Sequence, residues 1–62
     1  MKWEEVNTVR DFRTFRNGDS VMTIFHSIHD HIFNVIIEIE GKVITNHQMG
    51  RPGILRYYGI DL

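Results

Sequence analysis

The sequence predicts a small, mainly β domain, and three observations support this fold class. The 62-residue chain holds nine isoleucines and five valines but no alanine, and residues branched at Cβ favour strands over helices. The dipeptide Asn17-Gly18 is typical of a two-residue hairpin turn. Residues 31–40 alternate in the manner of a half-buried strand. The core face expected for that strand consists of His31, Phe33, Val35, Ile37 and Ile39.

The N-terminal segment has two interpretations. Apolar residues recur at every third position from Trp3 to Phe15, but in a helix this series spreads over about 240° and forms no single stripe. We therefore expect a short helical turn near residues 2–7 and then a strand over 8–16. The alternative is an α+β fold, in which one N-terminal helix packs on a three-stranded antiparallel sheet.

The remaining elements follow from turn signals. With Asn17 and Gly18 in the turn, the strand over 20–27 would pair with the strand over 8–16 and place Arg16 opposite Asp19. Gly41 permits a hairpin between residues 31–40 and 42–47.

The C-terminal segment 54–58 follows a Gly-Arg-Pro-Gly turn signal. It is either a fifth strand or a helical turn that ends at Gly59. We expect one domain over residues 1–62, an antiparallel meander of four or five strands that can curl into a small open barrel.

Composition excludes several classes of protein. The chain has no cysteine, which excludes disulfides and thiolate metal sites. Its formal charge of -1 is not the strongly basic character of most nucleic-acid-binding domains. No apolar run approaches the roughly 20 residues of a membrane span, and Lys2 is followed by glutamates where a signal peptide would be apolar. We expect a cytoplasmic protein without membrane contact.

The segment 26–31, HSIHDH, is the strongest chemical signal in the chain. Its three histidines could converge at a hairpin end, so His26, His29 and His31 are candidate zinc ligands. Their spacing matches no common zinc motif, and histidines at strand ends and turns are commonly half-exposed residues with local hydrogen bonds. His47 is expected on the sheet face opposite to His31. We therefore predict no cofactor and keep zinc at the three histidines as a minor alternative.

Catalysis is not expected. The chain has no cysteine nucleophile, Ser27 and His26 would point to opposite faces of a strand, and a 62-residue chain has little volume for a substrate pocket. A nucleic-acid-binding β domain is the main alternative function. It would use two arginine groups and neighbouring aromatic residues, namely Arg10, Arg13 and Arg16, and Arg51 and Arg56 beside Tyr57 and Tyr58.

Protein binding requires the fewest assumptions. The strand over 31–40 is apolar on both faces, and one sheet can bury only one of them, so we expect Ile32, Ile36 and Val43 to form a homodimer interface. The competing interpretation is that one end of the chain covers that face. We predict a stoichiometric inhibitor or regulator of a larger protein, of a size common in phages and mobile elements. The expected partner contacts are Arg13, Phe15, Arg56, Tyr57 and Tyr58, since arginine and tyrosine are enriched at interface centres.

Overall fold

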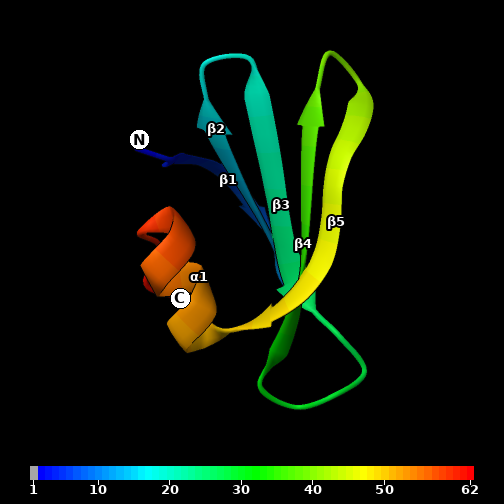
Figure 1. Ribbon diagram of the computed structural model, residues 1–62, viewed down its shortest axis with the longest axis vertical. Helices are drawn as coiled ribbons and strands as arrows, with labels where there is room; N and C mark the ends of the chain where they lie inside the picture. Colours follow the sequence, from blue (N-terminus) through cyan, green and yellow to red (C-terminus); the bar gives the residue numbers. More distant parts are fainter. Residues whose placement is uncertain (1) are drawn as a thin grey trace.

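The computed structural model describes residues 2–62 and shows a five-stranded antiparallel sheet with one helix packed on it (Figure 1). The strands lie in the sheet in chain order, so every neighbouring pair is a hairpin. This confirms the mainly β meander. The sheet is not closed, and β1 and β5 lie at its edges. The elements are β1 (Glu4–Val9), β2 (Phe12–Asn17), β3 (Ser20–His26), β4 (Ile32–Ile39), β5 (Lys42–Gly50) and α1 (Arg51–Tyr58).

The expected N-terminal helical turn is wrong, and so is the alternative N-terminal helix. Residues 4–9 form the edge strand β1, and the single strand expected over 8–16 is divided by a turn at Arg10 and Asp11. Arg10 has a positive φ of 56° there. Arginine rarely adopts this conformation, so the sequence carries no recognisable turn signal at this point.

The turn between β2 and β3 uses Gly18 and Asp19 instead of Asn17 and Gly18, because Asn17 pairs with Ser20. Gly18 has a positive φ of 60°, and glycine at the first loop position fits a type II′ turn. The register therefore differs by two residues from the expected one, and Arg16 lies opposite Val21. An even shift leaves every side chain on its expected face.

The β4–β5 hairpin contains a bulge that reverses the faces along β5. Its turn residues Glu40 and Gly41 have positive φ values of 52° and 79°, as a type I′ turn requires. The register shifts between Ile37 and Glu38, which leaves Ile44 as the extra residue. Beyond the bulge His47 lies opposite Val35, on the core face. The expected position of His47 on the other face is therefore wrong.

The core lies between the sheet and α1. We call the sheet face that α1 covers the inner face, and the opposite face the outer face. Figure 1 shows α1 and both ends of the chain on the same side of the sheet. Trp3 and Leu62 pack against the core from the two ends. The buried core residues are Phe15, Met22, Ile24, Phe33, Val35, Ile37, Ile54 and Ile60.

Helix α1 begins directly after β5 and confirms the helical interpretation of residues 54–58. Pro52 lies in its first turn, where the fixed φ of proline suits a helix and the missing N–H is no loss. Gly59 ends the helix with a φ of 69°, and its backbone N–H donates to the carbonyl of Leu55 at 2.9 Å. Among residues 2–62, no helical segment has both the length and the apolar character that crossing a membrane requires.

The contact between α1 and the sheet makes a prediction about stability. Ile54 is 0% exposed, whereas its neighbour Leu55 is 51% exposed. We expect Ile54→Ala to lower the free energy of unfolding by about 2–4 kcal/mol, because the change removes buried methyl groups and leaves a cavity. The matched control Leu55→Ala should lower it by less than about 1 kcal/mol. Urea titration measures both, and equal losses would contradict this account of the core.

Candidate functional site

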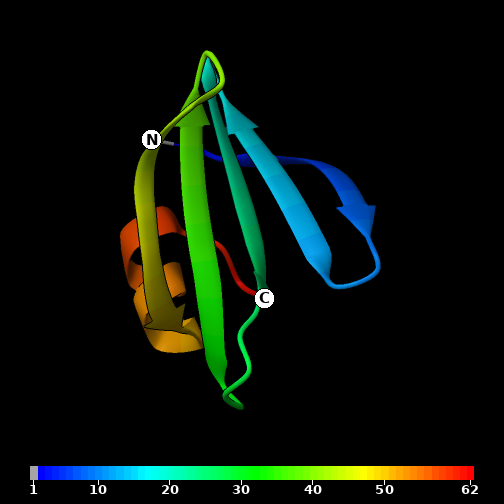
Figure 2. The ribbon, with the colours of Figure 1, turned by 90° about the vertical axis from the view of Figure 1, so that its right-hand side faces the viewer.

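The outer face is a continuous sheet surface, and no other segment among residues 2–62 packs over it (Figure 2). Its most exposed apolar side chains are Val9, Phe12 and Val43, with exposed fractions of 56%, 50% and 57%. The central side chains are half-buried by one another. The register places the following apolar side chains on this face: Val9, Phe12, Val21, Phe25, Ile32, Ile36 and Val43.

The three residues expected at a dimer interface all lie on the outer face. Ile32 pairs with Gly50 and Ile36 with Asn46, while Val43 lies one strand away, opposite Glu38. Neither end of the chain covers them, because Trp3 and Leu62 pack on the inner side. The structure therefore brings these three residues to one surface, and their role in association stays a prediction.

Sequence reasoning missed an aromatic pair on the same face. The rings of Phe12 and Phe25 lie with their centroids 5.0 Å apart, within the range of favourable aromatic pairs. In the expected register, which pairs Arg16 with Asp19, Phe12 would lie opposite Thr23. A turn at Gly18 and Asp19 would have indicated the correct pairing.

The polar side chains of the outer face include two that hydrogen-bond to each other. The Gln48 amide donates to the Asn34 side-chain oxygen at 3.2 Å, and Thr14 lies opposite Thr23. A polar group that already has a partner costs less free energy to remove from water than one that has none. The outer face therefore mixes apolar side chains with polar ones, and the register also places Glu4, Arg16 and Glu38 on it.

The five residues expected to contact a partner do not form one surface. Phe15 is 3% exposed, so its ring is a core element with no surface to offer a partner. Tyr58 lies half-buried at the core edge, edge-on to Trp3 with ring centroids 6.3 Å apart. Its hydroxyl is 3.3 Å from Nε2 of His47, and burial raises the pKa of the Tyr58 hydroxyl.

Arg56 and Tyr57 lie on the exposed side of α1. Tyr57 is 74% exposed, and together with Pro52 and Gly53 these two residues line a shallow hollow of about 280 Å³. We call these four residues the helix patch. It combines an aromatic ring and a guanidinium group, the side chains that most often dominate the binding energy of protein interfaces.

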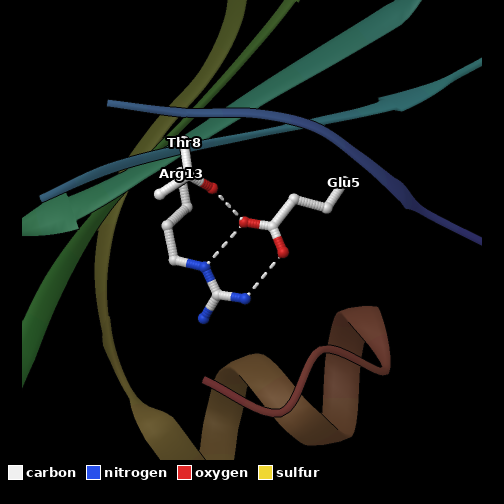
Figure 3. Close-up of polar contacts among 3 residues, drawn as sticks. All are labelled: Glu5, Thr8 and Arg13. Carbon is white, nitrogen blue, oxygen red and sulfur yellow. Dashed lines mark hydrogen bonds and ion pairs between the residues drawn. The ribbon is translucent and has the colours of Figure 1, made fainter. Parts of the chain in front are cut away.

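Arg13 is held by Glu5 on the inner side of the β1–β2 hairpin (Figure 3). Its Nε and Nη2 donate to the two carboxylate oxygens at 2.9 and 2.8 Å, and the Thr8 hydroxyl donates to the same carboxylate. These hydrogen bonds lower the pKa of Glu5 to about 2 and raise the pKa of Arg13. The pair links the edge strand β1 to its neighbour β2.

The three candidate zinc ligands have different surroundings. The His26 ring lies against Phe33 on the inner face, with centroids 4.6 Å apart, whereas His29 and His31 lie in the loop between β3 and β4. Ser27 organises that loop, since its Oγ accepts the His29 N–H at 3.0 Å. Within residues 2–62, no group of three or more histidine, aspartate or glutamate side chains is arranged to hold a metal ion.

The arginines that sequence reasoning placed in two groups are regrouped by the fold. Arg10, Arg13 and Arg51 line one hollow together with His26, whereas Arg16 and Arg56 lie elsewhere. No sequence signal indicated this grouping, because it depends on the position of α1 against the ends of β2 and β3.

Comparison of the chain with protein-family models, with curated proteins and with solved structures found no significant match. A function for this chain is therefore argued from its own surfaces.

The Glu5–Arg13 pair makes stability depend on pH. The pKa of Glu5 is about 2 in the folded chain against an ordinary value of 4.5, so its contribution is complete above about pH 4.5 and is lost as the pH falls toward 2. We expect Tm to fall over this window and Glu5→Gln to flatten part of the fall. The effect should be modest, because both side chains are about one-third exposed, at 32% and 36%.

Thermal unfolding followed by circular dichroism across this pH range measures the effect. Glu4→Gln is the matched control, since Glu4 lies on the same strand but the structure gives its side chain no ion pair among residues 2–62. A fall in Tm as steep in Glu5→Gln as in Glu4→Gln would show that the pair does not stabilise the fold.

Proposed function

We propose that the chain is a small protein-binding module that works stoichiometrically, as an inhibitor or regulator of a larger protein, and does so as a homodimer. The observation that carries the proposal is the apolar outer face, which neither α1 nor the chain ends cover. Exposed apolar side chains gathered on one uncovered face of a small domain are typical of an interaction site. The accessible surface of 4665 Å² also exceeds the roughly 4200 Å² expected of a compact monomer of this mass.

The area of the outer face is sufficient for a dimer. Five strands of six to nine residues, at about 4.8 Å spacing and 3.3 Å rise per residue, give a face of roughly 500 Å². Two such faces packed together would bury on the order of 1000 Å², which is the lower bound for a specific interface. Face-to-face packing of two antiparallel sheets is also a common arrangement.

The edges of the sheet are less suited to association than its face. Each edge strand contains an irregularity, at Val6 in β1 and at Ile44 in β5. Bulges of this kind disturb the row of backbone donors and acceptors that edge-to-edge pairing requires. Association therefore favours the outer face over β1 or β5.

A dimer formed through the outer faces would leave α1 of each protomer pointing away from the contact, because α1 lies on the inner face (Figure 1). Each protomer would then present its own helix patch, with Arg56 and Tyr57, to a larger protein. Two patches on opposite sides of one particle suit a protein that occludes or tethers its target.

Light scattering tests the dimer. We expect a molar mass twice the 7.4 kDa of one chain, and a return to one chain in Ile36→Lys, because a charge would be buried between the sheets. Leu55→Lys is the control, since Leu55 is exposed on α1 and lies away from the outer face. A wild-type chain that is monomeric at millimolar concentration would contradict the proposal.

Pull-down with the tagged chain tests the helix patch. We expect a specifically retained protein to be lost when Arg56 and Tyr57 are both changed to alanine, because truncating such side chains commonly costs 2 kcal/mol or more, ~30-fold in affinity. Lys42→Ala, at the exposed start of β5, should retain it. Equal retention by both variants would show that the contact lies on another surface.

A further inference from the structure

A hollow of about 150 Å³ opens on the inner side of the sheet. Its basic side chains come from four parts of the chain: Arg10 in the β1–β2 turn, Arg13 on β2, His26 at the end of β3 and Arg51 at the start of α1. Leu62, after the helix, lines it as well. The buried side chains Ile24 and Phe33 also line it. A cationic rim above an apolar floor is the pattern of a site for an anion that carries an apolar group.

Two of the three guanidinium groups around the hollow have no carboxylate partner. Glu5 compensates Arg13, and this is the one ion pair that the structure shows among residues 2–62. Arg10 and Arg51 are therefore left with Asp11 as the acidic side chain that lines the same hollow. Both arginines line the same hollow without an ion pair, so a bound anion would compensate their charge.

Two of the basic side chains are also partly positioned in advance. The Arg51 guanidinium lies over the Phe33 ring at 5.5 Å from its centroid, and His26 lies against the same ring at 4.6 Å. Arg10 adopts a positive φ of 56°, a strained conformation for a non-glycine residue. Glycine or asparagine would adopt this turn conformation with less strain, so an arginine at this position has a conformational cost.

We propose that this hollow binds a phosphate group carried on a small aromatic or apolar body. Phosphate has three terminal oxygens and carries most of two charges at neutral pH, so it can accept from Arg10, Arg51 and His26 together. A carboxylate offers two oxygens and one charge. The hollow is smaller than the 300 Å³ or more of typical drug-sized ligand sites, which limits the body to about one ring. The site lies on the inner side, so it is independent of association through the outer face.

Phenyl phosphate is the probe for this site, with the full chain observed by two-dimensional amide NMR at constant ionic strength. We expect saturable shifts centred on residues 10, 11, 26 and 51. Arg10→Gln and Arg51→Gln should each weaken binding at least fivefold, because each removes a bidentate donor. Asp11→Asn should tighten it, because it removes the acidic group from the rim. Arg56→Gln, on the same helix but outside the hollow, should leave it unchanged.

Two further ligands test the need for the apolar body and the need for the phosphate group separately. Inorganic phosphate should bind several-fold more weakly than phenyl phosphate, because it has no apolar body to contact the apolar lining of the hollow. Benzoate should also bind more weakly, because it lacks the third oxygen and the second charge. The proposal is overturned by shifts that do not saturate, by equal weakening in Arg51→Gln and Arg56→Gln, or by benzoate binding as tightly as phenyl phosphate. Circular dichroism of each variant confirms that the fold is retained.

Discussion

The fold depends on the packing of α1 against the inner face of the sheet. The chain has no cysteine to form a disulfide, and a 62-residue domain buries only about 60% of the surface of its unfolded chain. Its one core therefore needs a cover, and Ile54 and Ile60, from the helix and the segment after it, supply the side chains that close it. Without this cover both faces of the sheet would meet water, and the apolar inner face would lose the burial that stabilises the fold.

The same packing gives the two faces of the sheet different properties. Because α1 and both chain ends lie on the inner side, the apolar residues of the outer face have no cover from their own chain. Helix α1 also brings Arg51 to the ends of β2 and β3, which creates the cationic hollow. Because α1 packs on one side of the sheet only, the structure has an uncovered surface on one side and a charged site on the other. The sheet lies between them.

The sequence predicted the faces of a strand correctly where inward and outward residues alternate regularly. It failed where one inserted residue reverses that alternation. The burial of Phe33, Val35 and Ile37 follows from strict alternation along β4. The bulge at Ile44 reverses the faces of β5, and a single inserted residue leaves no trace in composition. The turn at Arg10 was missed for a related reason, since its positive φ is imposed by hairpin pairing against the preference of the side chain.

The sequence by itself determined the mainly β class and the apolar character of both faces of β4, because these depend on local preference and on neighbours along the chain. It left residues 54–58 open between a strand and a helical turn that ends at Gly59. Tertiary structure decided which face α1 covers and which arginines share a hollow. Those features arise from contacts between residues far apart in the chain, such as Arg51 with Phe33. Local preference contains no information about such contacts, since many arrangements satisfy it equally until the core is packed.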